Sequence, residues 1–139
     1  MNHESILTYI EQLVREYPQI ESVWLLGSRA NDSYREDSDW DLLVFANKGI
    51  LDAMRQQREL KRERVDVLVV YDSINFEEPW PEVEENGRVR AKGGKLSGST
   101  PFSWEWNQTS QTEATYEGTK RLQGGQTERT LKRAVRLWP

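Results

Sequence analysis

The stretch from Val23 to Phe45 constrains the fold of this chain more than any other part of it. Two short apolar runs, at 23–26 and 42–45, enclose a Gly-Ser pair at 27–28 and an Asp-x-Asp at 39–41, with ten residues between the two motifs. The second run is nearly all apolar beyond its aspartates, as expected for a strand that is covered on both faces. The stretch therefore predicts two strands, joined by a polar connection, in a sheet that is flanked by helices.

Apolar periodicity in the first half of the chain predicts the elements around these strands. Apolar residues at helical spacing predict a helix over 4–17, which Pro18 ends, and a second helix over 50–60. The other elements predicted in this half are strands at 21–26, 40–45 and 64–72 and a short helix or turn at 28–33.

The second half of the chain is richer in Gly, Pro and charged residues. Ser110 and Glu113 form a capping-box pattern, which predicts a helix over 111–122 that ends at Gly124 and Gly125. The last segment, 129–139, is compatible with either a strand or a helix. The remaining predictions are an exposed connection over 73–86, a hairpin arm over 88–97 and a strand over 102–106.

Together these elements predict an α/β (α+β) fold: a mixed β-sheet flanked by helices, with a C-terminal β/α extension packed on it. A chain of 139 residues is long enough to bury one core, so we expect a single domain over 1–139. Within it, residues 5–72 form the predicted core and residues 73–139 the extension.

Composition narrows the chemistry that such a domain can perform. The chain has no cysteine, which excludes disulfides, thiol nucleophiles and Cys-ligated zinc, and its one histidine, His3, lies near the N-terminus. Mainly oxygen ligands must therefore hold any metal, which favours Mg²⁺ or Mn²⁺. The net charge of −4 gives no basic footprint, so a nucleic-acid partner is not expected.

The chain also lacks the patterns of a membrane or secreted protein. No apolar run approaches the roughly 20 residues that span a bilayer. The first ten residues do not combine a basic region with an apolar one, as a signal peptide does. We therefore expect a cytoplasmic protein with no membrane partner.

Three carboxylates are predicted to meet at one end of the sheet. Side chains two residues apart in a strand point to the same face, so Asp39 and Asp41 project together. If Asp66 lies at the same height on a neighbouring strand, the three can hold two metal ions about 3.5–4 Å apart, the arrangement that clamps an in-line phosphoryl displacement. Gly27 and Ser28, after a strand, offer backbone N–H groups and a hydroxyl to a phosphate. The combination indicates transfer of part of a nucleotide.

These motifs resemble the nucleotidyltransferase superfamily that includes DNA polymerase beta, and within it the minimal nucleotidyltransferase branch. Gly27, Ser28, Asp39 and Asp41 match the signature of that branch at its spacing, and Asp66 matches its third carboxylate. The resemblance covers residues 5–72. Many members have glycine at the position of Asn31, so this chain departs from the pattern there.

The resemblance implies a role for each matched residue. Asp39 and Asp41 would bind both metal ions, and Asp66 would bind the catalytic metal and help to deprotonate an acceptor hydroxyl. The residues implied in holding the triphosphate are Gly27, Ser28 and Arg29. From the residues alone, Arg29 can equally well form an ion pair with an acidic residue of the loop after it.

The reaction implied is transfer of a nucleotide monophosphate, AMP from ATP, to a hydroxyl of a protein or small molecule, with release of pyrophosphate. Members of this branch commonly act with a helical HEPN-like partner, and some are antitoxins that add AMP to it. A homo-oligomer is the other arrangement expected. The competing hypothesis is a catalytically weak nucleotide-binding or regulatory module that acts through a protein partner.

Two further groups of side chains have structural interpretations. Trp104 and Trp106 are suited to stacking on a nucleotide base, but aromatic residues of half-buried strands more often pack on the sheet. The basic residues toward the C-terminus are suited to attracting phosphate or RNA, but a solvated basic face is the favoured interpretation; they are Lys120, Arg121, Arg129, Lys132, Arg133 and Arg136.

Overall fold

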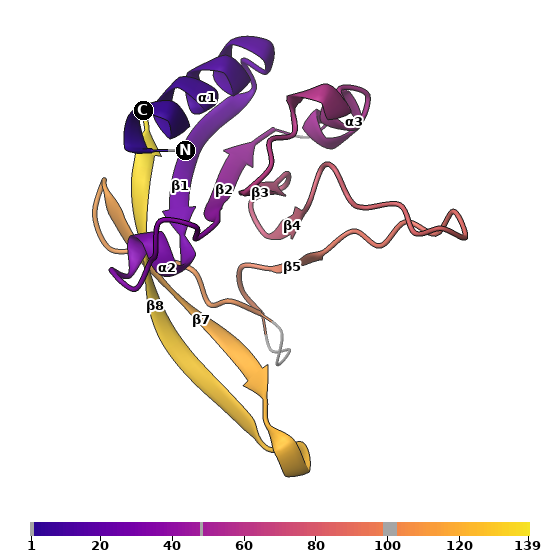
Figure 1. Ribbon diagram of the computed structural model, residues 1–139. Helices are drawn as coiled ribbons and strands as arrows, with labels where there is room; N and C mark the ends of the chain where they lie inside the picture. The colour runs from indigo at the N-terminus through magenta and orange to yellow at the C-terminus, as the bar shows by residue number, and fades with distance from the viewer. Residues whose placement is uncertain (1, 48, 99–102) are drawn as a thin grey trace.

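The computed structural model describes residues 2–47, 49–98 and 103–139, apart from the side chains of 119–121. Figure 1 shows a curled mixed sheet with α1 against its N-terminal strands and a long hairpin that extends away from α1. Within the described residues the sheet has eight strands, in the order β5-β4-β3-β2-β1-β8-β7-β6. The predicted fold class is confirmed: an α/β fold with a mixed sheet, flanked by helices, and an extension packed on it.

The helices and 3₁₀ turns are short and lie mainly in the first half of the chain. Their bounds are α1 His3–Glu16, α2 Gly27–Ala30, α3 Ile50–Arg55, η1 Arg58–Leu60 and η2 Gln123–Gly125. The strands are β1 Ile20–Leu26, β2 Trp40–Ala46, β3 Val65–Val70, β4 Asn75–Glu77, β5 Gly93–Lys95, β6 Asn107–Gln108, β7 Glu113–Arg121 and β8 Thr127–Trp138. No helix in the described residues is long and apolar enough to cross a membrane.

Helix α1 forms where its apolar spacing predicts. Asn2 caps it, because the Asn2 side chain accepts a hydrogen bond of 2.9 Å from the Ser5 N–H. The apolar stripe of α1 is buried against the sheet at Ile6, Tyr9, Ile10 and Leu13. The second predicted helix is shorter than expected: α3 ends at Arg55, and its continuation toward Leu60 is the 3₁₀ turn η1.

The sheet has a buried cluster on each face. On one face, β2 contributes Leu42 and Val44 to the cluster that includes α1. On the other, it contributes Leu43 to a cluster with Ala114 and Tyr116 of β7. Strand β2 is therefore covered on both faces, as its apolar sequence predicts. The second face is closed by the curl of the sheet, which brings the C-terminal strands over it.

The segment 73–86 is not an exposed connection, and that prediction is wrong for its middle part. Phe76 is buried in β4, and Trp80 is buried in the cluster beside α3, where its Nε1–H donates a 2.6 Å hydrogen bond to the Met54 carbonyl. The prediction of an exposed connection was based on the glutamates of this segment, which lie close to the buried Phe76 and Trp80 in the sequence. Beyond the anchors the chain is exposed, at 82–90.

Trp80→Ala is expected to lower the free energy of unfolding by about 3–5 kcal/mol, because it leaves a cavity in the core and removes a buried hydrogen bond to the Met54 carbonyl. Urea denaturation measures the change. As a control, Leu131→Ala removes a side chain that is 65% exposed and should change the stability by less than about 0.5 kcal/mol. Equal effects for the two variants would contradict the burial of Trp80.

The predicted helix over 111–122 is wrong, since strand β7 occupies most of these residues. The Ser110 hydroxyl accepts hydrogen bonds from the N–H groups of Thr112 and Glu113. These bonds stabilise a turn just before β7, and no helix begins there. Ala114 and Tyr116 then alternate into the core, which is the period of a strand. The glycines at 124–125 belong to the hairpin turn between β7 and β8.

Three other predictions concern the second half of the chain. The last segment, left open between strand and helix, is strand β8, which pairs with β1 and with β7. The strand predicted over 102–106 does not form in its described part: Ser103 makes only an isolated bridge with Lys95. Residue 102 lies outside the described residues. The hairpin arm predicted over 88–97 contains β5, which pairs with β4.

Candidate active site

Asp41 and Asp66 lie side by side on adjacent parallel strands. They are register partners in the pairing of β2 with β3, so their side chains leave the same face at the same height. That face is the one closed by the C-terminal half, since Leu43, two residues beyond Asp41, belongs to the cluster there. The predicted meeting of these two carboxylates is therefore present in the structure.

Gly27 is the residue that lets the chain turn directly over Asp41. Leu26 is the register partner of Asp41, so β1 ends beside the carboxylate. Gly27 has φ +69°, and a Cβ atom built on it would lie 2.2 Å from Asp41 Oδ2. A side chain at this position is therefore strained by the backbone conformation and would displace the Asp41 carboxylate.

The Asp41 carboxyl lies in an environment that disfavours its charge. The pKa of Asp41 is raised from 3.8 to about 6, most of all by burial, and also by the nearby charge of Asp66, a hydrogen bond with Asp66 and the charge of Asp39. Lys132 acts in the opposite direction and lowers the pKa. A divalent cation between the two carboxylates would remove this penalty, because it favours the ionised form of both.

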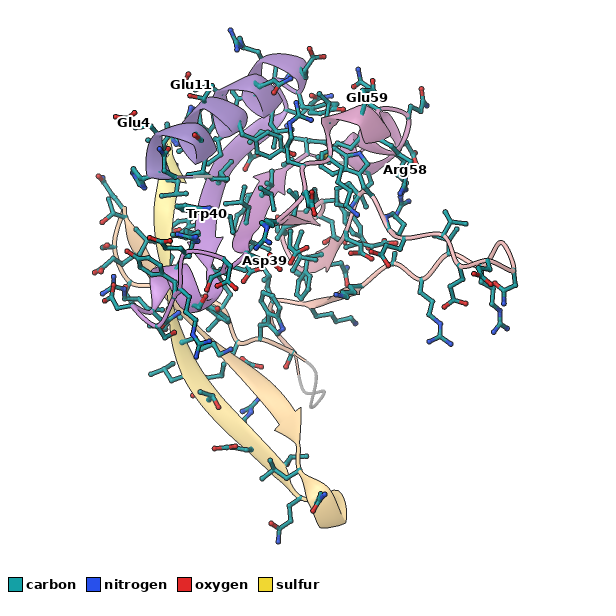
Figure 2. All side chains as sticks on the ribbon, in the orientation of Figure 1. Glu4, Glu11, Asp39, Trp40, Arg58 and Glu59 are labelled. Atoms are coloured by element: carbon teal, nitrogen blue, oxygen red, sulfur yellow. The ribbon has the colours of Figure 1, made fainter. Side chains whose placement is uncertain are left out.

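Asp39 lies in the loop just before β2, near the end of the sheet that faces α2 (Figure 2). It acts on Asp41 through its charge, but its side chain does not complete a compact group with the other two carboxylates. In residues 2–47, 49–98 and 103–139, no three His, Cys, Asp or Glu side chains gather closely enough to form a metal-ligand group. What the structure assembles is a pair of carboxylates, whose hard oxygen donors fit Mg²⁺ or Mn²⁺.

Ser28 and Arg29 lie in the short helix α2, directly after Gly27. Ser28 is half-buried in α2, where its carbonyl accepts the N–H groups of Asn31 and Ser33. The guanidinium of Arg29 is 4.2 Å from the centre of the Trp40 ring. It also donates hydrogen bonds to backbone carbonyls of the loop, at Arg35, Glu36 and Ser38. The contacts of Arg29 therefore organise the loop between α2 and β2.

A cleft of about 270 Å³ opens above Gly27, Asp41 and Asp66. The described residues that line it include none of Ser28, Arg29 and Asp39. Its remaining walls come from β1, β2, β3 and the C-terminal half. The residues that the C-terminal half contributes are Glu78, Lys92, Trp104, Tyr116 and Lys132.

Tyr116 connects the C-terminal side of the cleft to the turn at Gly27 by a hydrogen bond. Its hydroxyl oxygen accepts a 3.1 Å hydrogen bond from the Gly27 N–H. Burial raises the pKa of the Tyr116 hydroxyl, the Gly27 hydrogen bond lowers it and the charge of Asp41 raises it again. The hydroxyl therefore remains protonated at neutral pH.

The contribution of the hairpin to the cleft was missed in the sequence. Reading 111–122 as a helix placed Tyr116 and Lys132 on unrelated elements, whereas they are register partners across β7 and β8. The available signal was the alternation of Ala114 and Tyr116 before the glycines of the turn. The two tryptophans do pack on the sheet: Trp104 lies 4.3 Å from Phe76 and Trp106 lies 5.3 Å from Trp24, between ring centres.

Asn31 fastens the hairpin to the turn at Gly27. Its side-chain N–H₂ donates to the Gly27 carbonyl at 2.8 Å and to the Arg133 carbonyl at 3.0 Å. Its side-chain oxygen accepts the Arg133 N–H at 2.9 Å. The Asn31 side chain therefore has a structural role that a glycine at this position could not fill, since glycine has no side chain to make these bonds.

Asn31→Ala is expected to lower the free energy of unfolding by about 1–2 kcal/mol and to speed hydrogen exchange at the Arg133 amide, because the variant loses these hydrogen bonds. Amide exchange followed by NMR measures the local effect. Asn107→Ala, in the exposed strand β6, provides the control. Unchanged exchange at Arg133 in Asn31→Ala would show that the side chain does not hold the hairpin.

Comparison with known proteins agrees with this geometry. A model of the family described as polymerase beta, nucleotidyltransferase, matches residues 8–84, more than half of the chain. No curated protein and no solved structure matches the chain. The matched region contains α1 from residue 8 onward, the Gly27 turn, both carboxylates of the cleft and strands β1 to β4, in a fold consistent with that family. The chain therefore belongs to the polymerase beta nucleotidyltransferase family.

Proposed function

We propose that this protein is a metal-dependent nucleotidyltransferase that moves a nucleotide monophosphate, AMP from ATP, to a hydroxyl acceptor. The observation that carries the proposal is the register pairing of Asp41 with Asp66, directly beneath the turn at Gly27. Two carboxylates in this position repel each other unless a cation or a proton lies between them. The raised pKa of Asp41 is consistent with a site built for a cation.

The roles of the residues follow from where each can act. Asp41 and Asp66 would hold Mg²⁺ or Mn²⁺, with Asp39 as the third ligand after a change in its side-chain position. The metal, when bound, would neutralise charge on the triphosphate and on the leaving group. Ser28 and Arg29 would assist through the turn and through the loop between α2 and β2.

The bond changes in the proposed reaction balance without another reactant. The acceptor oxygen forms a bond to the α-phosphorus while the bond from that phosphorus to the bridging oxygen of the β-phosphate breaks. The products are a nucleotidylated acceptor and pyrophosphate. The proton of the acceptor hydroxyl passes to the Asp66 carboxylate, which is solvent-exposed and can release it to water.

The acceptor is inferred from the resemblance and from the net charge of the chain. Resemblance to the minimal branch favours a cytoplasmic enzyme that acts on, or with, a helical HEPN-like partner, or as a homo-oligomer. The net charge of −4 makes a nucleic-acid acceptor unfavourable. The chain is expected to form the donor half of the site, with the hydroxyl brought by the partner or by a small molecule.

Label transfer distinguishes an enzyme from a binding module. The protein, with and without co-purifying proteins, is incubated with Mg²⁺ and ATP labelled at the α- or the γ-phosphate. We expect label to reach an acceptor from the α-phosphate only, and the transfer to stop with EDTA or with Asp66→Asn. Asp52→Asn, an exposed aspartate in the first turn of α3, is the matched control and should retain activity.

The other outcomes would contradict the proposal. Transfer of the γ-label would indicate a kinase. Binding of a partner protein by both wild type and Asp66→Asn, with no transfer of either label by the wild type, would indicate a regulatory module.

A further inference from the structure

The β7–β8 hairpin completes the cleft on the side opposite the carboxylates. Across the curled sheet the order of strands is β3, β2, β1, β8 and β7. The functional groups follow the same order: Asp66 and Asp41 first, then Gly27 at the end of β1, then Lys132 and Tyr116. The cleft therefore has Asp41 and Asp66 on one side and Lys132 and Tyr116 on the other, with the glycine turn between them; Glu78 and Lys92 also line it.

Lys132 presents a cation to the cleft from a defined position. It is the register partner of Tyr116, so both side chains leave the same face of the hairpin. The neighbours on that face, Ala114 and Ala134, are small and fully buried, which fixes the base of the hairpin against the sheet. Within the described part of the chain, no ion pair within 4.0 Å involves Lys132. Its ammonium group is therefore available to an anion in the cleft.

Tyr116 changes what the glycine turn offers to a ligand. Its oxygen accepts the Gly27 N–H, so the amide hydrogen is directed to the phenol and not to the cleft. A phenol that accepts one hydrogen bond can still donate its own hydrogen. The ring is 6% exposed and packed between Trp104 and Trp106, which holds the hydroxyl in place. The donor at this point of the cleft is therefore the Tyr116 hydroxyl.

We propose that Lys132 and Tyr116 form the binding site for the β- and γ-phosphates of the nucleoside triphosphate. This inference rests on the proposed function and adds to it the part of the substrate that the hairpin recognises. The α-phosphate lies over Asp41 and Asp66, where transfer occurs. The pyrophosphate portion extends toward β8, where Lys132 supplies a charge-assisted contact and the Tyr116 hydroxyl supplies a neutral one. The hairpin thus selects triphosphates over monophosphates.

The test compares triphosphate and monophosphate binding in charge-matched variants. Lys132→Met removes the cation from the cleft, and Arg129→Met removes one from the opposite face of the same strand, where Arg129 pairs with Glu117 at 3.7 Å. The Kd values of Mg²⁺·ATP, AMP and inorganic tripolyphosphate are measured by calorimetry, and KM and kcat by pyrophosphate release. Lys132→Arg tests whether another cation restores binding, and Tyr116→Phe removes only the hydroxyl.

We expect Lys132→Met to raise the KM and the Kd of Mg²⁺·ATP and the Kd of tripolyphosphate about tenfold or more, as loss of one charge-assisted contact predicts. AMP affinity should stay unchanged, Lys132→Arg should recover most of the loss and Arg129→Met should resemble the wild type. Tyr116→Phe should raise the same constants several-fold. It should also leave the Gly27 amide less protected in hydrogen exchange.

Two results would overturn the inference. If Lys132→Met binds Mg²⁺·ATP as tightly as Arg129→Met does, while the wild type transfers α-label, the hairpin does not bind the phosphates and the proposed function stands. If Lys132→Met weakens AMP and ATP equally, the residue acts on the nucleoside or on the fold. Failure of the wild type both to bind Mg²⁺·ATP and to transfer label would overturn the proposed function itself.

Discussion

Asp41→Asn is expected to reduce nucleotidyl transfer by about 1,000-fold or more and, at the same time, to stabilise the metal-free protein. The loss follows from removing a charged metal ligand, which contributes several kcal/mol to the transition state. The gain follows because the folded state raises the pKa of this carboxyl from 3.8 to about 6. The folded protein therefore favours the protonated form, and ionisation at neutral pH destabilises it.

The pH dependence of the Asp41 contribution to stability determines whether Asp41→Asn stabilises or destabilises the protein. The stability associated with Asp41 is fully present below its unfolded pKa of 3.8 and is lost as the pH rises through about 6. Asparagine carries no charge at any pH. In EDTA the variant should exceed the wild type by about 1 kcal/mol at pH 7.5, since solvent screens a half-buried charge, and the difference should disappear below pH 4.

Urea denaturation over this pH range, with EDTA or with saturating Mg²⁺, measures both effects. With Mg²⁺ the order should reverse, because only the wild type gains the free energy of metal binding. An Asp41→Asn variant that is less stable than the wild type in EDTA at pH 7.5, or one that retains transfer, would be inconsistent with a cation site at this carboxylate.

Gly27→Ala is expected to reduce transfer by about 100-fold or more and to lower the free energy of unfolding by about 1–2 kcal/mol. The new Cβ would lie 2.2 Å from Asp41 Oδ2, so the carboxylate must leave its position. Displacement of a reacting group by about 1 Å is enough for a loss of this size. The stability cost has a second source, because φ is +69° at this residue.

Gly87→Ala is the matched control for this substitution. Gly87 has φ +80° and no atom within 4 Å of an added Cβ, so it carries the same backbone strain without the contact. It should lose a similar amount of stability and keep full activity. Pyrophosphate release by the two variants, compared at equal folded fraction, measures the difference. Equal activities would show that the approach of Gly27 to Asp41 is not needed for transfer.

The helices and strands of the first half of the chain could be predicted because the local sequence patterns there agree with the tertiary packing. Helix α1 has an N-cap, one apolar stripe and a proline after it, and β2 is apolar on both faces. The register that pairs Asp41 with Asp66 follows from two similar apolar strands that start at the same edge. The elements that the local patterns predict are therefore the ones that the long-range pairing stabilises.

The structure of the second half was harder to predict from the sequence, because it depends on contacts between residues that are distant in sequence. Strand β7 has an exposed face and a capping-box pattern before it, and only pairing with β8 decides its conformation. Trp80 is buried within a run of prolines and glutamates that is locally typical of a loop. Both cases show tertiary packing prevailing over local propensity.

The residues of the candidate site also differ in whether the sequence could predict them. Gly27, Asp41 and Asp66 were predictable because a spacing motif and strand alternation identify them. Tyr116 and Lys132 were not, because nothing local relates residues of two strands on either side of a turn to a glycine 89 positions before one of them. Arg29 had two predicted roles, and its observed contacts with loop carbonyls and Trp40 belong to neither.

The central claim is that the cleft between the carboxylate pair and the hairpin binds a metal and a nucleoside triphosphate for transfer. The most direct measurement is a crystal structure with Mn²⁺ and a non-hydrolysable ATP analogue, in which anomalous scattering locates the metal. We predict Mn²⁺ in contact with Asp41 and Asp66, the α-phosphate beside it and the terminal phosphates toward Lys132. Metal or nucleotide bound elsewhere, with this cleft filled by Tyr116 and water, would contradict the claim.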